Sequence, residues 1–169
     1  MCIRDRTRTL THENPAGVDA ELAAFIFREA RLADEARYSE WESLWADDAS
    51  YRVPMRPDDD PARTVAYIND NRARIRSRVA QLNTGVRHSQ TPPSVMRRII
   101  SNLEVLERDG DVVTVGANFV LFEYRHALTP WAGRYVYRIR TGGAEPKLVT
   151  KTVHLVNGAG AIPTMSFLV

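Results

Sequence analysis

Residues 105–126 read VLERDGDVVTVGANFVLFEYRH, and this stretch decides the fold class. It contains the dipeptide Asp109-Gly110, a strong signal for a tight turn, between two runs that are rich in Val, Ile and Phe. We therefore predict two long antiparallel strands, over residues 95–108 and 112–126. The letters FVLF at residues 119–122 are apolar at every position, which indicates that the second strand lies centrally in a sheet or is covered by a neighbouring chain.

Two further strands are predicted toward the end of the chain, over residues 134–140 and 148–156, joined at Thr141-Gly142-Gly143. In the first of them, large apolar or aromatic residues alternate with arginines, at Tyr135, Tyr137 and Ile139 against Arg134, Arg138 and Arg140. A period of two is typical of a strand with one face in water. The second half of the chain is therefore predicted to form an antiparallel sheet of long strands.

The residues before this sheet show the period of helices. Apolar residues recur at spacings of three and four over residues 19–38. Ser39 and Glu42 form a capping-box pattern, which predicts a short helix to about Asp47 with an inner face of Trp41, Leu44 and Trp45. Residues 51–55 have strand character. A third helix is predicted before Asn83-Thr84-Gly85, with an apolar stripe of Ile68, Ile75, Val79 and Leu82. The class is α+β, with the helices on one face of the sheet.

The composition limits the kind of protein this is. A chain of 169 residues with 44% hydrophobic residues is enough for one domain with its own core. The single cysteine, Cys2, excludes an internal disulfide and any cluster held by several thiolates. A net charge of +2 is too small to suggest nucleic acid, and no stretch is apolar enough to predict a membrane span. We expect a cytoplasmic protein in which residues 1–18 are a disordered or non-native tail and residues 19–169 form the domain.

Several strings spread over the chain resemble one family. They are Tyr38-x-x-Trp41-x-x-Leu44-Trp45 with Tyr51-x-Val53-Pro54, Arg72 to Leu82 with Thr84-Gly85, Ser89-Gln90-Thr91-Pro92-Pro93-Ser94 with Arg97-Arg98 and Ser101-Asn102, Gly133-Arg134, and residues 165–169. Together they resemble the small (β) subunit of aromatic-ring-hydroxylating dioxygenases, which has the nuclear-transport-factor-2-like (NTF2-like) fold. His88 and the pair Val95-Met96 depart from the family pattern, which leaves the aromatic substrate open.

The resemblance implies a fold and a set of partners. The fold is an α+β NTF2-like cone, with N-terminal helices packed on a strongly curved antiparallel sheet. In that family a large α subunit holds a Rieske [2Fe–2S] cluster and a mononuclear iron, while the β subunit is mostly structural, in an α3β3 or similar assembly. We therefore expect no cofactor in this chain, and α subunits and other β subunits as its partners. The single cysteine agrees, because a Rieske centre needs two cysteines and two histidines.

A surface for contact with another chain is also expected. The loop SQTPPS is polar and stiffened by prolines, which reduces the entropy lost on docking. Arg97 and Arg98 fall on opposite faces of one strand, so at least one of them points inward or into an interface and needs a partner. The predicted contact residues are His88, Ser89, Gln90, Pro92, Pro93, Ser94, Arg97 and Arg98. Arginines at alternate positions of the third helix are a second candidate surface, at Arg72, Arg74, Arg76 and Arg78.

Two other functions stay open. The same superfamily includes dehydratases and isomerases with an Asp/His pair and a Tyr inside the cone, and the candidates for such a cavity are Asp48, Tyr51, His88 and Asn118. In a purely structural interpretation, Asp48 ends a helix, Tyr51 fills the core and Asn118 pairs in the sheet. A ligand-binding domain without chemistry is the other possibility. An iron site is not expected, because no tight spacing links His12, His88, His126 and His154.

Overall fold

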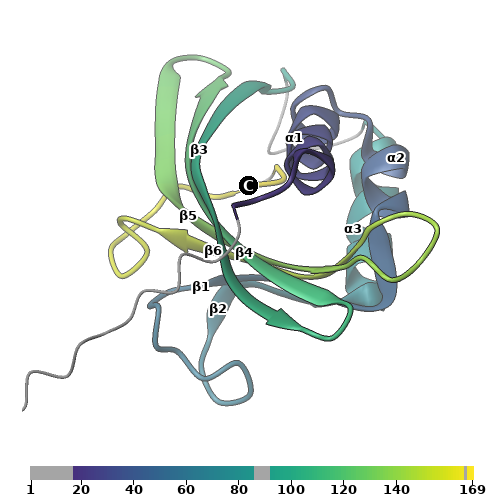
Figure 1. Ribbon diagram of the computed structural model, residues 1–169. Helices are drawn as coiled ribbons and strands as arrows, with labels where there is room; N and C mark the ends of the chain where they lie inside the picture. The colour runs from purple at the N-terminus through teal and green to yellow at the C-terminus, as the bar shows by residue number, and fades with distance from the viewer. Residues whose placement is uncertain (1–16, 86–91, 166) are drawn as a thin grey trace, which may run out of the picture.

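The computed structural model of the chain describes residues 17–85, 92–165 and 167–169. Within these ranges, three helices and six strands follow one another as α1 (Ala20–Asp34), α2 (Tyr38–Ser43), β1 (Trp45–Pro54), β2 (Ala66–Asn71), α3 (Arg72–Asn83), β3 (Val95–Asp109), β4 (Val112–Tyr124), β5 (Leu128–Arg140) and β6 (Lys147–Leu155). Figure 1 shows the sheet curving around the helices, which gather on its concave side. The predicted α+β class, with helices on one face of a curved sheet, is confirmed.

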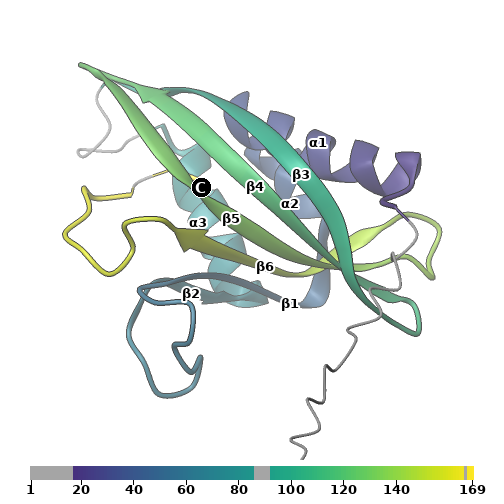
Figure 2. The ribbon, with the colours of Figure 1, turned by 60° about the vertical axis from the view of Figure 1, so that its left-hand side comes forward.

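The six strands form one sheet in the order β2-β1-β6-β5-β4-β3. The long strands β3 to β6 run antiparallel to one another, as predicted, and cross the molecule in Figure 2. One pair differs from the predicted antiparallel sheet, because β1 runs parallel to β6. β5 begins at Leu128, six residues before its predicted start, so that its full length pairs with β4.

The second helix is shorter than predicted, and its capping box is wrong. α2 has Arg37 as its N-terminal cap residue, without a side-chain capping bond, and ends at Ser43. The Ser39 hydroxyl instead accepts a hydrogen bond from Asn83 Nδ2 at 3.1 Å, and the Glu42 carboxylate accepts one from Arg72 at 2.9 Å. Both side chains are used in contacts with α3, which compete with local capping. Residues 45–47 are strand rather than helix, because the chain pairs with β6 from Trp45 onward.

The third helix also begins later than its predicted apolar stripe. Ile68 belongs to β2, a short strand that pairs with β1. Asn71 caps α3 by accepting the Arg74 amide at 3.0 Å, and the helix buries Ile75, Val79 and Leu82. The predicted stripe is confirmed for Ile75, Val79 and Leu82. Ile68 is buried in the same core, but it lies on a strand.

The core lies between the helices and the concave face of the sheet. Tyr135, Tyr137 and Ile139 of β5 are fully buried while Arg138 between them is exposed, which confirms the predicted alternation. α1 starts at the cap Asp19, whose carboxylate accepts the Leu22 amide at 2.8 Å, and packs Leu22, Phe25 and Ile26 inward.

Candidate functional site

The concave interior holds a buried ion pair. Glu29 of α1 and Lys151 of β6 are both 0% exposed, and Lys151 Nζ lies 2.9 Å from Glu29 Oε1. The same carboxylate oxygen accepts a hydrogen bond from Trp41 Nε1 at 2.6 Å. The ammonium group also lies 4.4 Å from the centre of the Tyr135 ring, a cation–π distance. Each charge therefore has partners within the chain.

Burial and neighbouring charges shift the pKa values of several side chains in this interior. Burial lowers the pKa of Lys151 to about 8, although the Glu29 carboxylate acts in the opposite direction. Burial alone would raise the pKa of Glu29, but the charges of Lys151 and Arg98 hold that pKa below its ordinary value. Burial raises the pKa of Tyr51 and of Tyr137, so both phenols stay protonated at neutral pH. The charges of Glu29 and Lys151 in this interior are therefore held in one ion pair.

Residues 167–169 fill the mouth of this interior, and all three are buried. Arg98 Nη2 donates a hydrogen bond to the Leu168 carbonyl at 2.8 Å. The Tyr51 hydroxyl donates to the Val169 carbonyl at 2.9 Å and accepts the Val169 amide at 3.1 Å. Phe167 packs edge-on against Trp131, with ring centres 5.4 Å apart. Figure 1 shows this end of the chain inside the concavity.

The structure does not bring the candidate cavity residues together. Asp48 is exposed and bonds the Arg140 guanidinium at 2.9 Å, a hydrogen bond that lowers the pKa of Asp48. Asn118 is exposed as well, and accepts a hydrogen bond from Arg134 at 3.2 Å. Tyr51 alone points into the interior. His88 lies outside the described residues. Asp48, Tyr51 and Asn118 therefore share no cavity.

The described residues show no metal-binding cluster. Over residues 17–85, 92–165 and 167–169, no group of three or more His, Cys, Asp or Glu side chains is placed to hold a metal ion. His126 is exposed, whereas His154 is half-buried and has its pKa lowered by burial and by Arg52 and Arg134. His12 lies outside the described residues. Within the same ranges, no helix is long and apolar enough to cross a membrane.

The convex side of the sheet carries apolar side chains at one end. Cross-strand partners there form three rows, which run Val95–Tyr124–Leu128, Arg97–Phe122–Pro130 and Ile99–Val120–Ala132. The exposed fraction is 63% for Val95, 62% for Ile99, 55% for Tyr124 and 63% for Leu128. We call the apolar members the outer-face patch, made of Val95, Ile99, Val120, Phe122, Tyr124, Leu128, Pro130 and Ala132. The next row is polar, because Arg134 pairs there with Glu104 and Asn118.

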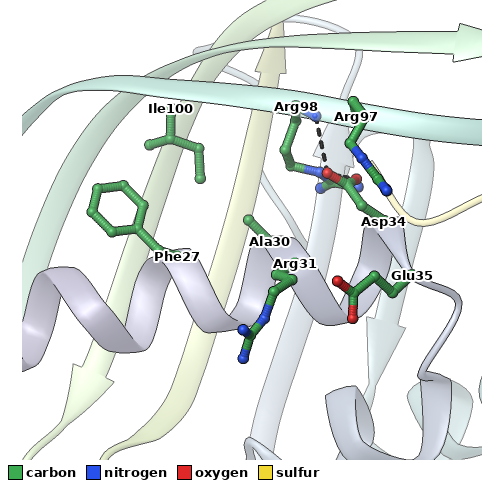
Figure 3. A pocket seen from close by; sticks show the side chains of 8 residues that line it. All are labelled: Phe27, Ala30, Arg31, Asp34, Glu35, Arg97, Arg98 and Ile100. Atoms are coloured by element: carbon green, nitrogen blue, oxygen red, sulfur yellow. Dashed lines mark hydrogen bonds and ion pairs between the residues drawn. The ribbon is translucent and has the colours of Figure 1, made fainter.

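The predicted contact residues divide into three groups. His88, Ser89 and Gln90 lie outside the described residues. Pro92 and Pro93 are exposed and lead into the outer-face patch at Val95, while the Ser94 hydroxyl donates to Glu123 at 2.6 Å. Arg97 and Arg98 diverge, as predicted. Arg98 points inward and binds Asp34 at 2.7 Å, an ion pair drawn in Figure 3, whereas Arg97 is exposed at the sheet edge. Arg98 is therefore a core residue.

The arginines of α3 are partly used within the chain. Arg72 pairs with Glu42 at 2.9 Å and Arg78 with Asp70 at 2.6 Å, both with largely covered side chains. Arg74 donates to the Asn69 carbonyl at 3.2 Å. Arg76 is mostly exposed and lies 3.7 Å from Glu42. These contacts hold α3 against α2 and β2.

The buried pair of Glu29 and Lys151 was missed from the sequence, although each residue left a signal. Glu29 stands three residues after Ile26 and four after Phe25, on the apolar stripe of α1. Lys151 stands between the buried Val149 and Val153 at the period of a strand. A charged residue on a buried stripe needs a partner, so each position signals a buried polar contact. The signal does not identify which residue that partner is.

The chain matches a family model described as "Ring hydroxylating beta subunit" over residues 28–159. It is 28% identical to the small oxygenase component of the p-cumate 2,3-dioxygenase system of Pseudomonas putida, over 80% of this chain and 78% of that one. Its identity to benzoate 1,2-dioxygenase subunit beta of Acinetobacter baylyi is 29%, over 81% and 85% of the two chains. Among solved structures, the beta subunit of benzoate 1,2-dioxygenase from Burkholderia mallei superposes with a TM-score of 0.72 and 30% identity, over 83% and 92%.

Proposed function

Because the chain belongs to the family of ring-hydroxylating β subunits, we propose that it is the structural subunit of an aromatic-ring-hydroxylating dioxygenase. In this proposal a separate α subunit carries the Rieske [2Fe–2S] cluster and the mononuclear iron, and performs the oxidation of the ring. The present chain performs none of the chemistry. It holds α subunits in their assembly.

The outer-face patch is the observation that carries the proposal. Exposed apolar side chains from three adjacent strands lie next to one another on the convex face, where none of the helices in the described residues covers them (Figure 2). Contiguous apolar surface of this kind typically marks a site of protein–protein contact. Pro92 and Pro93 are exposed and lead into β3 at the same end of the sheet. A partner subunit that covers this end would remove the patch from water.

The interior supports the same assignment. In the described residues the concave chamber is filled by the Glu29–Lys151 pair, by large aromatic side chains and by residues 167–169. A substrate would have to displace these packed groups before it reached a buried side chain. A stand-alone dehydratase or isomerase needs an open cavity with converging acid and base groups, and Asp48, Tyr51 and Asn118 do not provide one.

We propose an α3β3 assembly in the cytoplasm. In a closed ring of three protomers, each chain contacts its own kind through two different patches and still needs a third surface for α. The outer-face patch and the free edge of β3 offer two of these surfaces, and the exposed side of α3 offers a third. The cytoplasmic location follows from the electron supply, because NAD(P)H is the donor that this class of reaction draws on.

Purification together with a large (α) subunit of a ring-hydroxylating dioxygenase from the same source tests the proposal. We expect the two chains to elute together, with all the iron and the visible absorption of the cluster lost when α is omitted. The isolated chain should contain no stoichiometric iron. One iron per isolated chain, lost on replacing both His126 and His154 with Ala, would overturn the assignment. So would a wild-type chain that stays monomeric in the presence of α.

A further inference from the structure

A groove of about 360 Å³ runs between α1 and the first half of β3, beside the free edge of the sheet. Figure 3 shows its two ends. At one end Phe27 of α1 and Ile100 of β3 face each other as apolar walls. At the other end Arg97 extends from β3 toward the last turn of α1, where Arg31 also lines the groove. We call this feature the α1–β3 groove.

The uncommitted charge in the α1–β3 groove is positive. Its carboxylate Asp34 is occupied by Arg98, which donates to it from Nε at 2.7 Å and from the backbone amide at 2.9 Å. The other carboxylate, Glu35, lies 3.6 Å from Arg37, whose Nε also donates to Glu40 at 2.7 Å, so Glu35 keeps part of its charge. The groove still has a positive balance, because three arginines line it with two carboxylates. Arg97 donates only to the Met96 carbonyl, at 3.0 Å, and within the part of the chain that is described neither Arg97 nor Arg31 forms an ion pair. The two guanidinium groups are therefore available to an anionic partner.

The backbone at the groove offers the edge of a sheet. β3 is the last strand of the sheet, and the Arg98 amide donates to Asp34 instead of to β4. Because the direction of backbone groups alternates along an antiparallel strand, the amide and carbonyl of Ile100 point to the same free side. Asp34 thus occupies the edge at Arg98, and the edge at Ile100 stays open to an extended segment.

The groove is continuous with the outer-face patch. Arg97 stands opposite Phe122 in the sheet, and its guanidinium turns around the edge to the Met96 carbonyl. One partner could therefore cover the patch and enter the groove. The parts of this chain outside the described residues are poor occupants, because residues 1–16 contain three arginines against two acidic residues and residues 86–91 contain Arg87 and no acidic residue.

We propose that the α1–β3 groove binds an extended segment of the α subunit that carries an acidic side chain beside an apolar one. The acidic group pairs with Arg97, while Arg31 adds positive charge to the same groove. The apolar group packs between Phe27 and Ile100, and the segment's backbone pairs with Ile100. This inference rests on the proposed function, since it names where the α subunit binds and by what chemistry.

Charge reversal tests the inference. The double variant Arg31→Glu/Arg97→Glu is compared with Arg56→Glu/Arg63→Glu, which changes the net charge equally at two exposed arginines outside the groove. Binding to the purified α subunit is measured by calorimetry at low and high salt, after thermal melting has shown that both variants are folded. We expect the groove variant to bind about 10- to 100-fold more weakly with a reduced salt dependence, and the control to change less than about threefold. Arg31→Gln/Arg97→Gln should lie between them.

Hydrogen exchange of the Ile100 amide provides a second readout that a general change of charge would not produce. Protection of this amide should increase when α binds, and should not increase in the presence of 10 mM benzoate alone. Wild-type affinity in the groove variant, or an unprotected Ile100 amide in the complex, overturns the inference while the proposed function stands. Protection by benzoate and not by α would assign the groove to a small aromatic acid and also overturn it. If the wild-type chain does not bind α at all, the proposed function itself fails.

Discussion

Leu121 and Phe122 are neighbours on β4, and they show how differently the two faces of this sheet are built. Leu121 is fully buried among the helices and residues 167–169, whereas Phe122 lies half-buried on the convex side between Arg97 and Pro130. The concave face is closed by contacts within the described residues, whereas one end of the convex face carries exposed apolar side chains. From this difference we infer that the concave side stabilises the fold of the chain and that the apolar end of the convex side contacts other subunits.

The polar groups of the two faces differ in the same way. Glu29 and Lys151 on the concave side satisfy each other out of water, as Asp34 and Arg98 do at 2.7 Å. Arg97 at the edge of the sheet and Arg31 on the neighbouring helix α1 have no ion-pair partner in the described residues. Changes inside should therefore affect folding, and changes outside should affect assembly.

The largest effect on folding is expected from breaking the buried pair. Glu29→Leu leaves Lys151 buried without its partner, which should lower the free energy of unfolding by about 3–5 kcal/mol. The matched double variant Glu29→Leu/Lys151→Met removes both charges and should recover most of that loss. Urea denaturation measures both. A single variant as stable as the wild type would show that the pair is not closed from water.

A sharper test uses the two neighbours on β4. Leu121→Ala should cost about 2–5 kcal/mol of stability, because a fully buried side chain is lost from the core. Phe122→Ala should cost clearly less, yet should weaken binding to the α subunit more than Leu121→Ala does. Denaturation and calorimetry on the same pair of variants separate the two quantities. Equal stability losses with equal binding would remove the distinction between the faces.

The pH dependence of stability should reveal Lys151. Its pKa in the folded chain is about 8, below its ordinary value of 10.5, so the unfolded chain binds more protons between these values. The free energy of unfolding should then rise with pH from about 8 toward 10, by on the order of 1–3 kcal/mol. Denaturation at several pH values gives the slope, with Glu29→Leu/Lys151→Met as control. Identical slopes in the wild type and the control would contradict this assignment.

The smallest effect is expected at Asp48. Its ion pair with Arg140 is exposed, and exposed pairs contribute little because water and salt screen them. Asp48→Asn should leave both the thermal midpoint and the turnover of the assembled oxygenase unchanged. Steady-state assays of the complex test the second point. A turnover that collapses in this variant, with assembly intact, would reopen a catalytic role for Asp48.

Local signals in the sequence were enough for most of the fold. Asp109-Gly110 marks the β3–β4 turn, where Gly110 has a φ of 58°, and the alternation of Tyr135 and Tyr137 with arginines marks β5. The sequence pattern did not predict the elements whose structure depends on contacts between residues far apart in the chain. β2 is short and polar, and is a strand because it pairs with β1.

The same limit applies to the site. Arg98 could be predicted to need a partner from its place on a strand, but Asp34 lies 64 residues away and local spacing cannot identify it. Glu29 and Lys151 are 122 residues apart and meet only in the folded chain. The outer-face patch was foreseen at residues 119–122 alone. Its full extent depends on the register that sets Val95 beside Tyr124 and Leu128.

The central claim is that the convex face joins this chain to other subunits, and the mass of the complex tests it most directly. Wild type, Phe122→Asp and the control Thr114→Asp, which lies on the same face of β4 outside the outer-face patch, are each produced with the α subunit and measured by light scattering after gel filtration. We predict the mass of α3β3 for the wild type and for Thr114→Asp, and separate folded chains for Phe122→Asp. An α3β3 mass for Phe122→Asp would contradict the account.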